Sequence, residues 1–280
     1  MFGYVVLHYL DFDTTFKCVS ILLENFPDSK VVIVDNASNN GTGEQLAKAF
    51  NQFNNVHVLI NQDNLGFAKG NNVGFEFAKK EFSLDALAVI NNDIYINDKN
   101  FEAEILKFMS DNYVDVSGPD IITLNGNHQN PLLLTNYSNK YIKKSIFLNK
   151  MKMFFLKSNF FFRLYCKRKE NKGPLIKDKK DTIFDCVLHG ACVVFSRHYI
   201  ENEDFAFLPI TFMYNEELIL DDYLKYKNYK TGYCSETSVS HLEGASTSKS
   251  HSIKKDKILF RFKNMTCSLK AQLKERKKYE

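Results

Sequence analysis

Short apolar runs alternate with helical patterns through the first hundred residues, and this alternation limits the fold more than any other feature of the sequence. The runs are continuous and rich in β-branched or aromatic residues, as buried parallel strands are. They cover residues 4–9, 30–34, 56–60 and 87–90, and helical patterns cover 16–23, 44–50 and 72–80. Such alternation predicts an α/β fold built on a doubly wound, mostly parallel sheet.

Polar and small residues follow the ends of these runs. Asp35 follows the second run, the segment 64–72 follows the third, and Asp93 comes shortly after the fourth. Ligands of such sheets bind beyond the carboxyl ends of the strands, so we expect these residues to face one cleft. The segment INQDNLGFAKGNNVG, residues 60–74, contains three glycines. Glycines permit a ligand to approach the backbone closely, yet the pattern is neither GxGxxG nor a Walker loop.

Beyond residue 100 the pattern is less regular. It predicts helices over 101–109 and 213–229 and strands over 114–117 and around CVVF in 182–196. A basic helix is predicted over 253–278. Within the predicted helix at 213–229, Asp221 and Asp222 are interpreted as solvated acids.

Charge is distributed very unevenly along the chain. Residues 140–180 contain 14 Lys and Arg against two acids, and residues 249–280 contain 11 against three, which leaves 12 basic and 28 acidic residues elsewhere. In the first basic segment the lysines are mixed with Phe147, Phe154, Phe155 and the run 160–162. This mixture predicts contact with an anionic membrane surface, with a solvated helical insertion as the equal alternative. No nucleic-acid recognition motif accompanies it, so no nucleic acid partner is expected.

The cysteines and the N-terminus bear on the compartment. The six cysteines form no CxxC pair, which favours a reducing environment. The start MFGYVVLHYLDFD has no basic leader, and no run of about 18 apolar residues occurs in the chain. We expect a cytoplasmic protein with a peripheral position on the inner face of the cell membrane.

Six segments together carry a resemblance to a known family. They are VVIVDNASNNGT (31–42), NQDNLGFAKGNNVG (61–74), VINNDI (89–94), HGACVVFSR (189–197), FMYNEELIL (212–220) and HLEGAST (241–247). In this order they resemble the inverting glycosyltransferases of family 2, with the GT-A fold, particularly the rhamnosyltransferase-like branch that builds bacterial surface polysaccharides. The resemblance implies a GT-A catalytic domain over 1–250, with a basic, aromatic-rich insertion at 138–181 and a basic helical tail at 251–280.

The resemblance also implies a site for the nucleotide of the donor. Asp35 stands where the family has a carboxylate that accepts a hydrogen bond from the pyrimidine base. A carboxylate only accepts, which suits the imide N–H of uracil or thymine in a UDP- or dTDP-sugar. The residues implied to surround the nucleotide are Asn64, Gly66, Phe67, Gly70 and Asn71.

Asn91, Asn92 and Asp93 stand in the place of the family's DxD motif, which implies a divalent metal, Mg²⁺ or Mn²⁺, on the donor diphosphate. Oxygen ligands suit either ion, and the metal would stabilise the leaving diphosphate. Here the first acid is replaced by Asn, so only Asp93 brings a full charge. His241 resembles the family's histidine that completes the metal and diphosphate site.

Glu216 and Glu217 stand where the family has two acids, the second taken as general base. A carboxylate is needed there because an acceptor hydroxyl is a poor nucleophile until its proton is removed. The choice between the two stays open, with Glu217 favoured. Without the resemblance, acids that begin a helix are explained by the helix dipole. Asp185, His189 and Gly190 occupy the position where the family lines the donor sugar and the acceptor.

The expected activity is therefore transfer of a hexose or deoxyhexose, for example rhamnose, from a UDP- or dTDP-sugar to a saccharide or lipid-linked glycan acceptor, with inversion. One alternative is a nucleotidyltransferase acting on sugar phosphates. It would need a second metal carboxylate and a basic residue near the triphosphate, for which Lys69 is the candidate. The other alternative is a non-catalytic saccharide- or membrane-binding relative, against which the intact acids at 93, 216 and 217 count.

Overall fold

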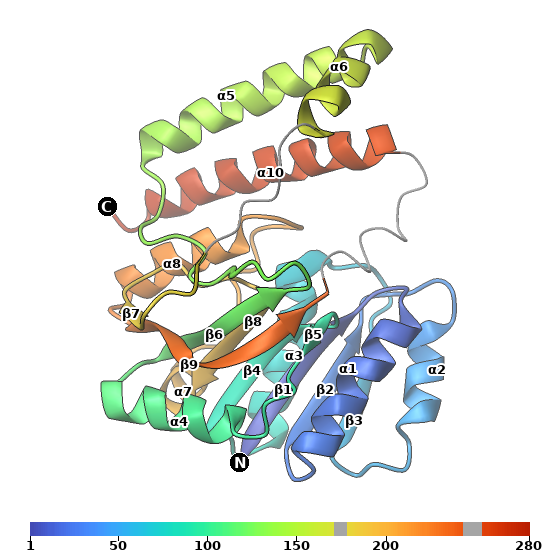
Figure 1. The fold of residues 1–280 in the computed structure, drawn as a ribbon, viewed down its shortest axis with the longest axis vertical. Helices are drawn as coiled ribbons and strands as arrows, with labels where there is room; N and C mark the ends of the chain where they lie inside the picture. The colour runs from blue at the N-terminus through green and yellow to red at the C-terminus, as the bar shows by residue number, and fades with distance from the viewer. Residues whose placement is uncertain (171–177, 243–253) are drawn as a thin grey trace.

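The computed structural model describes residues 1–170, 178–242 and 254–280 of the chain. Within them, nine strands form one sheet in the order β3-β2-β1-β4-β8-β6-β9-β5, with β7 paired to β9 (Figure 1). The first four strands are β1 (Phe2–His8), β2 (Lys30–Asp35), β3 (Val56–Ile60) and β4 (Ala86–Asn91), all parallel. The predicted α/β fold with a mostly parallel sheet is confirmed.

The second half of the sheet is mixed. Its strands are β5 (Ile94–Tyr95), β6 (Val116–Thr123), β7 (Ile183–Phe184), β8 (Cys192–Ser196) and β9 (Thr231–His241). Strand β8 is antiparallel to both β4 and β6, while β9 runs parallel to β6. The sequence analysis did not predict β9, because the segment TGYCSETSVSH has few apolar residues and is held mainly by its ladder with β6.

Helices cover both faces of the sheet, as a doubly wound fold requires. On one face lie α1 (Phe12–Asn25), α2 (Thr42–Ala49) and α4 (Phe101–Asn112); on the other lie α3 (Gly66–Glu81), α7 (Arg197–Asn202) and α8 (Glu216–Tyr226). Side chains of β1 alternate between the two cores: Tyr4 and Val6 pack with α1 and α4, and Val5 packs with α3.

The glycine cluster lies in the first turns of α3, which begins at Gly66, six residues before the predicted helix. A Cβ on Gly70 would lie 2.8 Å from Leu7 Cδ1, and one on Gly74 would lie 2.4 Å from Val5 Cγ1. These two glycines therefore let α3 pack closely on the sheet. Gly66 has a φ of +80°, and a Cβ there would lie 2.1 Å from the carbonyl oxygen of Phe212. Only glycine fits both demands easily.

Replacement of Gly74 by Ala should reduce the free energy of unfolding by about 1–3 kcal/mol, the usual cost of overpacking a core. The added methyl group would meet Val5 and Val34 in the core beneath α3. Urea unfolding followed by circular dichroism measures the change. Glu76→Ala, at an exposed position of the same helix, is the control and should change stability by less than about 0.5 kcal/mol. Equal stabilities of the two variants would contradict this account.

A third layer lies outside α8 (Figure 1). It contains α5 (Asn139–Leu156), α6 (Asn159–Glu170) and α10 (Lys254–Arg276), with α10 packed against both α5 and α8. The expected basic helical insertion and C-terminal helix are thus present and in contact. Residues 171–177 and 243–253, which include most of the HLEGAST segment, lie outside the described residues. No helix in the described parts of the chain is long and apolar enough to cross a bilayer.

Candidate active site

A cavity of about 510 Å³ opens at the carboxyl ends of β1 and β4. At this point the order of the strands reverses, because β2 and β3 lie on one side of β1 and β4 lies on the other. Ligands of open α/β sheets bind at such switch points, and the volume is that of a typical small-molecule site.

Most of the predicted site residues line this cavity. They are Asn64, Gly66, Phe67, Asn91, Asn92, Asp93, His189, Gly190, Glu216, Glu217 and His241. Four predicted residues are not among those lining it. Asp35 is buried and Asp185 is exposed, while Gly70 and Asn71 are buried within α3.

Asn36 ties the end of β2 to the start of α3 along one wall of the cavity. Its Nδ2 donates to Asn64 Oδ1 at 3.1 Å and to the carbonyl oxygen of Gly66 at 3.0 Å, and its Oδ1 accepts from the backbone N–H of Leu65 at 3.0 Å. Asp35, the residue before Asn36, is turned toward His8, whose Nε2 lies 3.8 Å from Asp35 Oδ1, and toward Gly43 of α2. Both oxygens of its carboxylate accept from the Ser38 N–H at 3.2 Å, so in this structure the carboxylate organises the turn after β2.

Asp93 and His241 meet through the pairing of β5 with β9, which places Ile94 opposite His241. Asp93 Oδ1 lies 3.4 Å from His241 Nε2, and His241 Nδ1 lies 2.6 Å from Gln129 Oε1. The contact with Gln129 holds the ring so that Nε2 faces Asp93. Metal-ligating histidines are usually oriented in this way, by a hydrogen-bond partner on the ring nitrogen that does not bind the metal.

Asp93 and His241 therefore fit a divalent cation that completes its coordination with oxygens of a ligand or water. No cluster of three or more His, Cys, Asp or Glu side chains suited to a metal occurs in the described residues. Among the described residues that line the cavity there are three carboxylates and no Lys or Arg. An anionic ligand would therefore meet no cationic Lys or Arg side chain in this lining, and a divalent cation at Asp93 and His241 would supply positive charge.

Glu216 and Glu217 are the first two residues of α8 and follow a tight turn in which Tyr214 and Asn215 have φ values of 73° and 76°. Glu216 is buried, and its Oε1 accepts from Thr211 Oγ1 at 2.8 Å. The Glu217 carboxylate lies over Gly190, where a Cβ would be only 2.8 Å from Glu217 Oε1. The glycine before β8 thus makes room for this acid.

Burial perturbs both acids in the same direction. Burial and the adjacent Glu217 raise the pKa of Glu216 to about 8, against a smaller opposing effect of the Thr211 hydrogen bond. Burial also raises the pKa of Glu217, while the backbone N–H groups of Glu217 and Gly190 oppose the rise. Both carboxylates also receive hydrogen bonds that favour the charged form, so these effects do not separate the two acids. Glu217 is the better candidate for a base because it is only partly buried and lies over Gly190 in the cavity, whereas Glu216 is buried and bound to Thr211.

Glu216→Gln should stabilise the protein at high pH. Between pH 4.5 and about 8 the folded state keeps the Glu216 proton that the unfolded state releases, so the free energy of unfolding falls as pH rises through this window. One pKa unit corresponds to about 1.4 kcal/mol, which limits the gain at pH 9 to about 5 kcal/mol. Urea unfolding of wild type, Glu216→Gln and the exposed control Glu201→Gln at pH 4 to 9 measures it. Parallel pH profiles for all three would refute the perturbed pKa.

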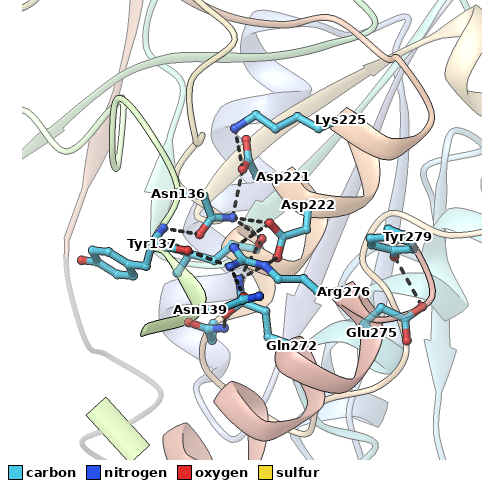
Figure 2. Close-up of polar contacts among 12 residues, drawn as sticks. Asn136, Tyr137, Asn139, Asp221, Asp222, Lys225, Gln272, Glu275, Arg276 and Tyr279 are labelled. Carbon is cyan, nitrogen blue, oxygen red and sulfur yellow. Dashed lines mark hydrogen bonds and ion pairs between the residues drawn. The ribbon is translucent and has the colours of Figure 1, made fainter. Parts of the chain in front are cut away.

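Helix α8 is held from outside by a polar network (Figure 2). Arg276 of α10 pairs with Asp222 through two hydrogen bonds, Nε to Oδ2 at 2.6 Å and Nη2 to Oδ1 at 2.7 Å. Gln272 donates to Asp222 Oδ2 at 2.8 Å and accepts from Asn215 Nδ2 at 2.8 Å. Asn136 Nδ2 contacts Asp221, Asp222 and the Leu218 carbonyl. The interpretation of the two aspartates as solvated acids is therefore wrong, since both bind partners distant in the chain.

Several lining residues were missed by the sequence analysis. They are Leu7, Tyr9, Asn36, Ala191, Phe212, Met213, Tyr214 and Phe260. Tyr9 and Asn36 follow strand ends and could have been found by the rule that indicated Asp35. Phe260 comes from α10, and no local signal in the sequence places it near the sheet.

Comparison with known proteins agrees with this architecture. A family model described as "Glycosyl transferase family 2" matches residues 5–172. A search of curated proteins finds no match. Among solved structures, TarS 1-349 of S. aureus is similar, with 16% identity, a TM-score of 0.53, and coverage of 94% of this chain and 71% of that chain. GalNAc-T7 with UDP, GalNAc and Mn²⁺ has 14% identity, a TM-score of 0.58, and coverage of 88% and 44%. The expected GT-A fold is confirmed.

Proposed function

The chain belongs to glycosyl transferase family 2, and on that premise we propose that this glycosyltransferase moves a hexose or deoxyhexose, for example rhamnose, from a UDP- or dTDP-sugar to a saccharide or lipid-linked glycan, with inversion. We place this reaction in the synthesis of bacterial surface polysaccharides, in the cytoplasm or on the inner face of the cell membrane.

The observation that supports the proposal is that three kinds of group line the same cavity. One wall carries the amides of Asn36 and Asn64, the carboxyl end of β4 carries Asp93 near His241, and α8 brings Glu216 and Glu217 to the same space. Transfer of a nucleotide-linked sugar needs these three functions together: a surface for the nucleoside, a group that stabilises the diphosphate, and a base for the acceptor.

Similar structures support the class of donor. TarS 1-349 of S. aureus was also solved with UDP and with UDP-GlcNAc. We therefore propose that the nucleotide lies along Asn36, Asn64, Gly66 and Phe67, and that Asp35 binds its pyrimidine base. Asn91 and Asn92 lie beside the diphosphate, and Asn71 and Gly70 support the wall from within α3. We propose that His189 and Gly190 contact the donor sugar and the acceptor. Asp185 is left out of this site because its side chain is exposed and does not line the cavity.

In the proposed reaction Glu217 takes the proton of the acceptor hydroxyl. The hydroxyl oxygen then forms a bond to the anomeric carbon while the bond from that carbon to the diphosphate oxygen breaks, and the nucleoside diphosphate leaves with the electron pair. Attack from the face opposite the leaving group inverts the anomeric centre. A divalent ion held by Asp93 and His241 would supply positive charge to the diphosphate. Gly190 and the backbone N–H groups near Glu217 keep its carboxylate directed into the cavity.

The nucleotidyltransferase alternative is less well supported. Lys69 is exposed on α3 and is not among the cavity lining. The described residues of the cavity lining therefore include no cluster of Lys or Arg side chains that could bind a triphosphate. Any measurable transfer of sugar would exclude the alternative of a non-catalytic relative.

A panel of UDP- and dTDP-sugars tests the proposal. Thermal shift with and without Mn²⁺ should identify a nucleotide sugar that raises the melting temperature, and release of the nucleoside diphosphate should follow with that donor. Binding of a donor with no release in the presence of diverse saccharide acceptors would favour the non-catalytic relative. Stabilisation by nucleoside triphosphates and sugar phosphates, but by no nucleotide sugar, would favour the nucleotidyltransferase.

A further inference from the structure

Exposed apolar side chains gather on α5 and α6, in the layer of the molecule farthest from the sheet (Figure 1). They are Tyr141, Phe147, Leu148, Met151, Phe154, Phe155, Phe160, Phe161 and Leu164. Phe154 and Phe160 are 71% and 69% exposed. Large apolar side chains gathered on the surface of a protein often mark an interaction site.

Four of these rings form one cluster where α5 turns into α6. The ring centroids of Phe154 and Phe155 lie 5.5 Å apart, those of Phe155 and Phe161 5.2 Å apart, and those of Phe160 and Phe161 5.4 Å apart. We name Phe154, Phe155, Phe160 and Phe161 the aromatic tip.

The aromatic tip is not needed to hold the third layer together. Helix α5 already buries Ile142, Asn149 and Leu156, which recur every seven residues, in the layer where it packs on α10. Helix α6 meets α10 through Tyr165 and Phe262, whose ring centroids are 6.2 Å apart. The chain therefore exposes large apolar side chains in addition to those that it buries.

The charge around the aromatic tip has one sign. No Asp or Glu occurs anywhere in residues 121–169, while α5 and α6 carry Lys143, Lys144, Lys150, Lys152 and Arg163. Lysine and arginine gain about 1 kcal/mol each near an anionic lipid surface, and aromatic side chains enter the headgroup region. The rest of the chain outside the two basic segments has 12 basic and 28 acidic residues, so such a surface would repel it.

We infer that the α5–α6 face docks on an anionic membrane surface, with the aromatic tip in the headgroup region and the neighbouring lysines on lipid phosphates. A second copy of the chain is a poorer occupant, because a two-fold contact would bring the same positive face onto itself. Single-stranded nucleic acid can stack its bases on exposed rings. The rings of the aromatic tip, however, stand edge to face, with interplanar angles of 79°, 64° and 76°, so they offer no continuous surface for successive bases.

Docking in this way would also orient the cavity. Helix α10, directly beneath α5, contributes Phe260 to the cavity lining, and its ring lies 6.4 Å from that of Phe212. The α10 side of the cavity would then lie toward the membrane. Resting on the proposed function, this arrangement deepens it: the acceptor would be a glycan carried on a membrane lipid.

Sedimentation of the full chain with vesicles tests the docking. We expect binding to phosphatidylcholine vesicles that contain phosphatidylglycerol, little binding to phosphatidylcholine alone, and loss of binding at high salt. The double variant Phe154→Ser/Phe160→Ser should weaken binding at least about tenfold. The matched control is Tyr113→Ser/Leu124→Ser, two exposed residues, 86% and 74%, outside α5 and α6. The control should bind as wild type does.

Three results would overturn the inference. The first is that the wild-type protein does not bind anionic vesicles, and the second is that the two double variants bind them equally well. The third result is that single-stranded nucleic acid, added at the same total negative charge as the lipid, displaces the protein from the vesicles. A change from dimer to monomer in the Phe154→Ser/Phe160→Ser variant would identify the face as a contact between copies. Nucleotide-sugar binding by the same preparations, measured without vesicles, separates this inference from the proposed function. Nucleotide-sugar binding should be the same in every variant as in wild type. If the wild-type protein bound no nucleotide sugar, that result would contradict the proposed glycosyltransferase function and leave the membrane inference standing.

Discussion

Replacement of Glu217 by Gln is expected to lower kcat for sugar transfer by roughly 10²- to 10⁴-fold, the range usual for loss of a general base. Glutamine keeps the size and polarity of the side chain but cannot accept the acceptor's proton. Donor affinity should change little, because the amide can still occupy the space over Gly190. Initial rates of transfer give kcat, and calorimetric titration with the donor gives its affinity.

Glu216→Gln is the matched control for this prediction. Glu216 is buried and bound to Thr211 at 2.8 Å, so its replacement should affect kcat much less than replacement of Glu217. A large loss in Glu216→Gln together with near-normal transfer by Glu217→Gln would assign the base to the other acid. Normal transfer by both variants would remove the proposed mechanism altogether.

Replacement of Asp93 by Asn should reduce kcat/KM by roughly 10²- to 10⁴-fold, since a divalent ion contributes several kcal/mol to stabilising a developing charge. The carboxylate of Asp93 lies 3.4 Å from His241 Nε2, and its loss leaves the histidine as the only member of the pair. We expect the stabilisation of the enzyme–donor complex by Mn²⁺ to disappear as well. Thermal shift at increasing Mn²⁺, with and without the donor, measures this second effect.

Asp185→Asn provides the control for the Asp93 variant. Asp185 likewise comes shortly after a strand, but its side chain is exposed and is not among the cavity lining. The same loss of charge there should leave both kcat/KM and the Mn²⁺ response near wild type. If Asp185→Asn lost as much activity as Asp93→Asn, the cavity would not be the whole of the site. If Asp93→Asn kept its activity and its Mn²⁺ response, the proposed metal site would be wrong.

The first half of the sheet, and the edge at which the cavity opens, could be predicted from the sequence. Strands β1 to β4 are continuous apolar runs, and this pattern is local and needs no knowledge of distant segments. The positions of Asp93, Glu216 and Glu217 in the cavity agree with the order of motifs along the chain. Strand β9 was not found, because a polar strand held by its partner has no such local pattern.

The contacts of individual side chains could not be predicted from the sequence and became clear only from the folded structure. Gly70 and Gly74 lie against Leu7 and Val5 of β1, and the lack of a side chain there lets α3 pack closely on the sheet. Asp222 is paired with Arg276, 54 residues away along the chain. His241 Nδ1 is bound to Gln129, 112 residues away, and this contact leaves Nε2 facing Asp93. Such contacts depend on how whole elements pack, and packing joins residues whose separation in the sequence has no fixed spacing.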